Sequence, residues 1–258
     1  MSGPSADLSA GAALAEAAVV GPYFTIQPWS PAVAWRPLGT LISDPAALSE
    51  RVGQARTALA GQAGMAPAEV EERVAASIVF LGLASQLVSP LLGATVIGGV
   101  VPLLALADLW WLPAGSGPWP LATRPADGIG VGQLTSDREV REVAVLLSDR
   151  VNRLTGPVAA AFGTGFRLSQ QVLRGNVASA LAGASGVLAG AFPSRAGTAG
   201  QLTAHVLAMG PLRGTGQFVP TGTTRIFMRR SCCLLYRVPG AGMCGDCVLR
   251  LGRPRRSS

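Results

Sequence analysis

The sequence predicts a predominantly α-helical fold with a small β component, of the α+β class, that ends in a compact C-terminal element. Three observations support this prediction. Capping residues open several amphipathic or apolar segments, strand-like segments are few and short, and the last 48 residues differ from the rest in charge and cysteine content. With 49% hydrophobic and 14% charged residues among 258, the chain can bury a core and is not intrinsically disordered.

The N-terminal part is expected to contain one short strand and then helices. Residues 23–26 are strand-like. Asp44 precedes Pro45, which is typical of a helix N-terminus, and this helix should reach about Gly61. Pro67 and the glutamates that follow it begin another helical segment, because acidic side chains stabilise the N-terminal end of a helix.

Residues 74–107 form a stretch of 34 residues without a charge. A bilayer requires about 20 apolar residues, so a transmembrane span has to be considered. Polar residues, glycines and prolines such as Pro90 and Pro102 interrupt the stretch, and its uninterrupted apolar runs are short. We therefore expect buried helices of a soluble core rather than a span, with peripheral attachment to a membrane still compatible with the composition.

Further helices and strands follow from local patterns. Ser136 or Asp137 can cap a helix that reaches about Leu154, with apolar residues on one face. Helices are also predicted over residues 168–188 and 196–209, a long loop over the Gly- and Pro-rich residues 113–133, and strands over residues 217–219 and 223–228.

The positive charge is concentrated at the C-terminal end. Residues 1–210 hold 12 arginines and 13 acids, a net charge of −1, whereas residues 211–258 hold nine arginines and one acid, a net charge of +8. All 21 basic residues are arginine, which indicates a compositional bias of the source as well. We expect a helical domain over 1–210, a basic element over 211–251 and a disordered tail over 252–258.

All four cysteines lie in this basic element. Cys232 and Cys233 are adjacent, ten residues follow, and Cys244 and Cys247 are separated by two residues. The intervening residues 238–242 are Val-Pro-Gly-Ala-Gly, which predicts a turn that brings the second pair back to the first. Disulfides, a structural zinc and an iron–sulfur cluster are the three chemistries open to four such thiols. A Rieske centre needs two histidines and is excluded, since His205 is the only one.

The cysteine pattern resembles that of the FhuF-like ferric-siderophore reductases, which bind a [2Fe–2S] cluster through a C-terminal Cys-Cys, ten residues, Cys, two residues, Cys. The four matching positions, Cys232, Cys233, Cys244 and Cys247, are therefore the implied cluster ligands, and the C-terminal element is implied to be an iron–sulfur binding element. The preceding arginines are also similar to that family, as are residues 235–237 (Leu-Tyr-Arg) and 174–176 (Arg-Gly-Asn).

Three arginines flank the cysteines. We expect Arg229, Arg230 and Arg237 to raise the reduction potential of the cluster, because a cation stabilises the more negative reduced form, and to contact an anionic complex or an acidic electron donor. The alternative is a solvated basic face in an arginine-rich protein. Two interpretations of residues 174–176 are open as well: a site of helix packing, or a polar site that faces the cluster or the siderophore.

The resemblance implies an enzyme, a ferric-siderophore reductase that adds one electron to the iron and so releases Fe(II). The expected partners are the ferric siderophore and a separate electron donor, such as a ferredoxin or a flavin-linked reductase. Residues 128–132 lack the context of a nucleotide-binding loop, and no nucleic-acid motif accompanies the arginines. No secretory signal opens the sequence, so a cytoplasmic location is expected. The alternative function is a non-catalytic, zinc-stabilised protein whose basic end docks an acidic partner.

Overall fold

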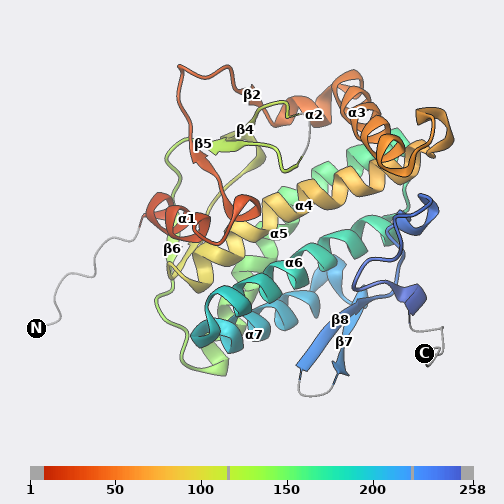
Figure 1. The fold of residues 1–258 in the computed structure, drawn as a ribbon. Coiled ribbons are helices and arrows are strands. Elements are labelled where there is room, and N and C mark those ends of the chain that lie inside the picture. The colour runs from red at the N-terminus through yellow and green to blue at the C-terminus, as the bar shows by residue number, and fades with distance from the viewer. Residues whose placement is uncertain (1–8, 115–116, 222–223, 251–258) are drawn as a thin grey trace, which may run out of the picture.

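The structure is a computed structural model that describes residues 9–114, 117–221 and 224–250. Its α-helices are α1 Ala10–Ala18, α2 Gly39–Ser43, α3 Pro45–Ala63, α4 Glu72–Val96, α5 Asp137–Phe166, α6 Gln170–Ala191 and α7 Ala196–Leu207. Its strands are β1 Gln27–Pro28, β2 Arg36–Pro37, β3 Val100–Pro102, β4 Leu109–Trp111, β5 Leu121–Thr123, β6 Gly128–Gly130, β7 Gly216–Thr221 and β8 Thr224–Arg229. The predicted α+β class is confirmed (Figure 1).

Helix α4 forms the centre of the fold and contacts α1, α3, α5 and α6 (Figure 1). Phe80, Leu87 and Leu91 of α4 are each no more than 1% exposed, and the Phe80 ring lies 5.4 Å from that of Phe162 in α5. By length and composition alone α4 and α6 could each cross a membrane, but 78% of the apolar window of α4 is buried inside the protein. The uncharged stretch thus supplies the core helix of a soluble-type fold.

The helix starts follow the predicted capping residues. At the start of α3, Asp44 Oδ1 accepts a hydrogen bond of 2.9 Å from the backbone N–H of Ala46. At the start of α5, Ser136 Oγ accepts from Glu139 N (3.3 Å) while Glu139 Oε2 accepts from Ser136 N (2.9 Å), which completes a capping box. These bonds satisfy backbone N–H groups that have no partner within the helix.

Helix α5 is longer than predicted, since it continues past Leu154 to Phe166 with Pro157 inside it. A proline removes one backbone hydrogen bond and usually bends or ends a helix. Val158, Phe162 and Phe166 continue the buried face of α5 beyond this proline. Burial of that face offsets the lost hydrogen bond, so the predicted end at residue 154 was wrong.

Two predictions about the N-terminal half were also wrong. Residues 22–24 form a 3-10 turn rather than a strand, and the strand β1 begins only at Gln27. The predicted loop 113–133 contains β5 and β6. β5 lies in a four-stranded sheet of order β1-β5-β4-β2, and β6 pairs with β3. Strands of two or three residues are too short to show an alternating pattern, and their partners lie far away in the sequence.

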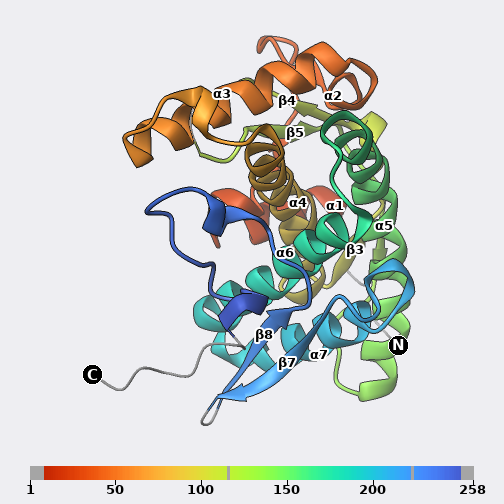
Figure 2. The same cartoon turned by 90° about the vertical axis from the view of Figure 1, so that its right-hand side faces the viewer.

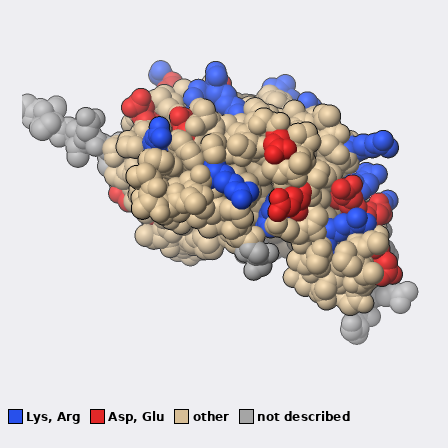
Figure 3. Space-filling model, turned by 90° about the horizontal axis from the view of Figure 1, so that it is seen from above, with Lys and Arg blue, Asp and Glu red and all other residues tan. Residues whose placement is uncertain are grey.

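The predicted C-terminal strands are confirmed as an antiparallel hairpin, β7–β8, in which Phe218 pairs with Phe227. The hairpin lies below α6 and beside α7, and the chain after it returns alongside α4 and α6 (Figure 2). Charged side chains are scattered over the face seen in Figure 3, with wide uncharged areas between them. The division of the chain at residue 210 stays a prediction, and the tail 252–258 lies outside the described residues.

Candidate metal centre

The cysteine-bearing segment begins where β8 ends. Arg229 is the last residue of β8, and Cys232 and Cys233 follow it after Arg230 and Ser231. The predicted turn is present: the N–H of Ala241 donates to the carbonyl of Val238 at 3.1 Å, and Gly240 has φ 77°. Proline at the second position and a glycine with positive φ at the third are typical of a type II turn. This turn reverses the chain and brings Cys244 back to Cys232 and Cys233.

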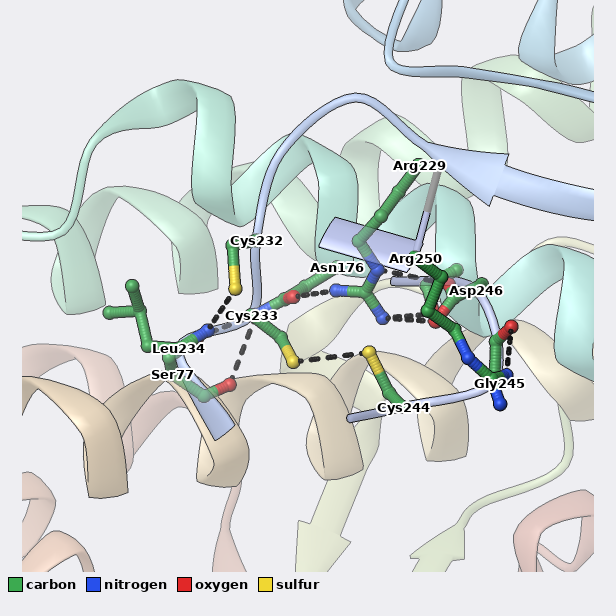
Figure 4. Close-up of polar contacts among 11 residues, drawn as sticks. Ser77, Asn176, Arg229, Cys232, Cys233, Leu234, Cys244, Gly245, Asp246 and Arg250 are labelled. Carbon is green, nitrogen blue, oxygen red and sulfur yellow. Dashed lines mark hydrogen bonds and ion pairs between the residues drawn. The ribbon is translucent and has the colours of Figure 1, made fainter. Parts of the chain in front are cut away.

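The four thiols are free and lie in two pairs. Cys233 Sγ and Cys244 Sγ are 3.5 Å apart (Figure 4), and the thiol of Cys232 interacts with that of Cys247. Cys233 and Cys247 are buried, whereas Cys232 and Cys244 are half-buried. Among the residues that the structure describes, no three or more His, Cys, Asp or Glu side chains converge on a single point. The two pairs are neighbours, because Cys232 also interacts electrostatically with Cys233.

This donor set fits a [2Fe–2S] cluster. Two thiolates bound at about 2.3 Å to one tetrahedral metal lie about 3.8 Å apart, close to the separation of Cys233 Sγ and Cys244 Sγ. A [2Fe–2S] cluster takes two thiolates on each iron, so it requires two pairs. A structural zinc also takes up to four thiolates, but around a single ion. The two contacting pairs therefore fit the cluster.

Backbone amides of this segment point at the sulfurs. Leu234 has φ 71°, and this left-handed conformation directs its N–H to Cys232 Sγ at 3.2 Å (Figure 4). Hydrogen bonding from Cys244 lowers the pKa of Cys233 to about 6, against burial and with help from the Leu235 amide and Arg229. The shared proton correspondingly raises the pKa of Cys244. Burial raises the pKa of Cys232. The Cys233–Cys244 pair thus shares one proton, and the remaining thiolate is available for metal binding.

Arg229 is buried and anchors the loop that carries Cys244 and Cys247. It is 1% exposed, and its Nε and Nη2 donate to the two carboxylate oxygens of Asp246 at 2.9 and 3.0 Å. Burial disfavours the ionised form of Asp246, but Arg229 outweighs this effect and lowers the pKa of the carboxyl group. Asp246 lies between Cys244 and Cys247, so this two-point ion pair fixes the loop that carries both (Figure 4).

The same guanidinium attaches the segment to the helical body. Its Nη1 donates to Asn176 Oδ1 at 2.8 Å, and its Nη2 donates to Ser179 Oγ at 2.6 Å, both on α6. Asn176 Nδ2 in turn donates to the backbone carbonyl of Ser77 on α4 at 3.0 Å. Hydrogen bonds therefore connect the core helix to the cysteine loop through Arg229. This confirms the packing role of Asn176 and also places it beside the cysteines.

Gly175 permits the close approach of the segment to α6. It is buried, and a Cβ at this position would collide with Ser231 Oγ. Arg174, by contrast, is exposed. Of the three residues singled out at 174–176, the glycine and the asparagine hold the cysteine-bearing segment, and the arginine faces outward.

The three flanking arginines occupy different environments. Arg229 is too buried to receive a complex from solution, so of its two predicted roles only an effect on potential remains. Arg237 Nη1 donates to both carboxylate oxygens of Glu71 at 2.6 and 2.8 Å, which compensates its charge. Arg230 is exposed. The roles of Asp246 and Ser179 as partners of Arg229 were not predicted from the sequence. Asp246 is the only acid of the C-terminal element, which was the available signal.

Two contacting pairs of thiols, with one buried and one half-buried cysteine in each, are a donor set that suits an iron–sulfur protein. Residues 229–249 match the family model of the FhuF 2Fe-2S C-terminal domain. The matched segment contains all four cysteines. The match supports an FhuF-like family for this chain and confirms the predicted [2Fe–2S] cofactor. No curated protein matches the chain.

Proposed function

We propose that this protein is a cytoplasmic ferric-siderophore reductase that adds one electron to a chelated Fe(III). The observation that carries the proposal is the two-pair arrangement of Cys232, Cys233, Cys244 and Cys247 in a segment matched by the FhuF 2Fe-2S domain. When bound, a [2Fe–2S] cluster supplies one electron at a time. The hard oxygen donors of a siderophore hold Fe(II) less tightly than Fe(III), so the added electron promotes iron release.

The residues of this chain have defined tasks in such a reaction. The cysteine pairs hold the cofactor, the amides of Leu234 and Leu235 donate to thiolates, and Arg229 fixes the loop between Cys244 and Cys247. Hydrogen bonds and positive charge near the sulfurs stabilise the reduced state. The electron comes from a separate donor, for which a ferredoxin or a flavin-linked reductase is suitable.

Purified protein tests the proposal directly. We expect red-brown protein with about two irons per chain, visible absorption that bleaches on dithionite, and Fe(II) release from a panel of ferric hydroxamate and catecholate complexes, trapped by a ferrous-specific chelator. Colourless protein that contains one zinc would contradict the cofactor and support the zinc-stabilised alternative. A red-brown protein that reduces no ferric complex would contradict the reductase function alone.

A first variant tests the ligand assignment. Cys232→Ser should lose most of the iron and the visible absorption, because one iron would keep a single thiolate. The matched control is Ser231→Ala, which leaves every thiol in place and removes a hydroxyl without a hydrogen-bond partner. We expect the control to keep wild-type iron content. A full cluster and full activity in Cys232→Ser would show that the assignment is wrong.

A further inference from the structure

A groove lies between α6, α7 and the β7–β8 hairpin. Its volume is about 820 Å³, and the described residues of all three elements line it. Cavities that hold small molecules are typically about 300–1,000 Å³ and largely apolar. The groove is therefore of a size that accommodates a compact chelate rather than a single ion or a water molecule.

One end of the groove reaches the cysteine loop. Gly245 and Asp246 line it there, and these two residues stand between Cys244 and Cys247. Ser179, which accepts a hydrogen bond from Arg229, lines the same end. Electron transfer weakens steeply with distance, so a redox partner of the thiolate loop has to sit close to it. The wall of this groove includes part of that loop.

The walls of the groove are largely apolar, and Arg225 carries the one lining charge that no ion pair compensates among the described residues. Phe218, Ile226 and Phe227 form the hairpin wall, where the two phenyl rings pack edge-on with centroids 5.6 Å apart. Arg225 is the cation among the lining residues and is exposed, with Nη2 donating to the carbonyl of Phe218 at 3.3 Å. Asp246 is the acid among them, but the ion pair with Arg229 compensates its charge. The groove thus favours a ligand with an apolar exterior and an anionic oxygen near Arg225.

From this geometry we propose that the groove between α6, α7 and the β7–β8 hairpin binds the iron(III) chelate, with Arg225 as its polar contact and Phe218 and Ile226 against its apolar exterior. This inference rests on the proposed function and assigns its substrate to a place on the molecule. The flanking arginines 229, 230 and 237 do not line the groove. The proposed substrate contacts are therefore residues of the hairpin and not the three arginines that the sequence suggested.

Glycines leave the groove open and provide the test. A Cβ at Gly200 of α7, which lines the groove, would meet no atom within 4 Å, so a longer side chain there fills the groove without disturbing packing. Gly190 of α6 has equally open surroundings but does not line the groove. Gly200→Leu and the matched control Gly190→Leu both replace a helical glycine by a good helix former, so their effects on folding should be alike.

The experiment measures binding apart from reduction. Ga(III) complexes of a trihydroxamate and of a tricatecholate siderophore resemble the ferric complexes but are not reduced, and titration calorimetry with iron-loaded protein gives their Kd. We expect Gly200→Leu to weaken binding at least tenfold and Arg225→Gln several-fold. Visible absorption and midpoint potential should stay unchanged in both, and Gly190→Leu should bind as wild type does.

The outcomes separate this inference from the proposed function. Wild-type protein that binds a Ga(III) complex in the groove but reduces no ferric complex would refute the reductase function and leave the binding site standing. Unchanged binding and reduction in Gly200→Leu would overturn the groove as the chelate site, and so would wild-type protein that binds no Ga(III) complex. A third result would also overturn the groove as the chelate site: slower reduction of the cluster by a protein donor in Gly200→Leu, with Ga(III) binding intact. The groove would then dock that donor.

Discussion

At the level of single residues, the ion pair of Arg229 and Asp246 links the cysteine loop to the protein body. Arg229 is 1% exposed, and it also donates to Asn176 and Ser179. A charge buried to this degree is stable only when its donors are satisfied. The cost of losing Asp246 should therefore exceed that of losing an exposed acid.

The prediction is that Asp246→Asn lowers the free energy of unfolding by about 3 kcal/mol and reduces iron loading, because an unpaired guanidinium would remain buried. The matched control is Glu71→Gln, which breaks the partly exposed ion pair with Arg237 and should cost about 0–1 kcal/mol. Urea denaturation and iron analysis measure both effects. Equal small losses in the two variants would show that the buried pair does not support the loop.

The sequence allowed recognition of the cysteine-bearing segment but not of these partners of Arg229. Asp246 lies 17 residues from Arg229, and Asn176 lies 53 residues from it. Spacing between cysteines is a local property of the chain, and the turn at 238–242 was readable from its proline and glycines. A contact between β8 and α6 depends on how separate elements pack, which no local pattern encodes.

At the level of elements, helix α6 serves as the platform for the cysteine-bearing segment. Gly175 admits Ser231, Asn176 and Ser179 hold Arg229, and the outer face of the helix lines the groove. One helix thus positions both the metal centre and the proposed substrate site. Small changes on this face should affect the segment more than the helix itself.

Gly175→Ala tests this arrangement, because the added Cβ would collide with Ser231 Oγ. We expect a loss of about 1–3 kcal/mol in unfolding free energy together with poorer iron retention, although alanine alone favours a helix. Gly183→Ala on the same helix meets no atom within 4 Å and should stabilise the protein by about 0.5–1 kcal/mol.

A double variant identifies the cause. Ser231→Ala removes the colliding hydroxyl, so Gly175→Ala combined with Ser231→Ala should recover most of the lost stability. Thermal unfolding of the single and double variants completes the cycle. Additive losses would mean that the two residues do not interact and that Gly175 serves another purpose.

At the level of the whole molecule, a nearly neutral helical body carries a strongly basic C-terminal element. Among the described residues, the core around helix α4 contains none of the four cysteines, which all follow the hairpin, and only Leu234 and Val238 of the cysteine-bearing segment join it. Metal binding stabilises the state that binds it, and the stabilisation should be strongest where the ligands are. The core is expected to stand without the cluster.

Removal of iron should therefore loosen residues 229–250 and leave α4 largely protected. Hydrogen exchange of iron-loaded and iron-free protein measures this, with faster exchange expected in the cysteine segment and little change in residues 72–96. Iron-free Cys232→Ser protein serves as the control for effects of the chelator. Equal loss of protection in both regions would contradict the predicted division near residue 210, because the core would then depend on the cluster.

The sequence by itself determined the helical class, most helix starts, the strands of the hairpin and the cysteine spacing of an iron–sulfur protein. Each depends on interactions between residues close in the chain: a capping side chain, an apolar face, a turn or a cysteine spacing. Only the tertiary structure decided the short strands, the length of α5, the partners of Arg229 and the groove beside the cysteine loop. These depend on packing between distant segments, and packing sets both which charges are buried and which spaces remain open.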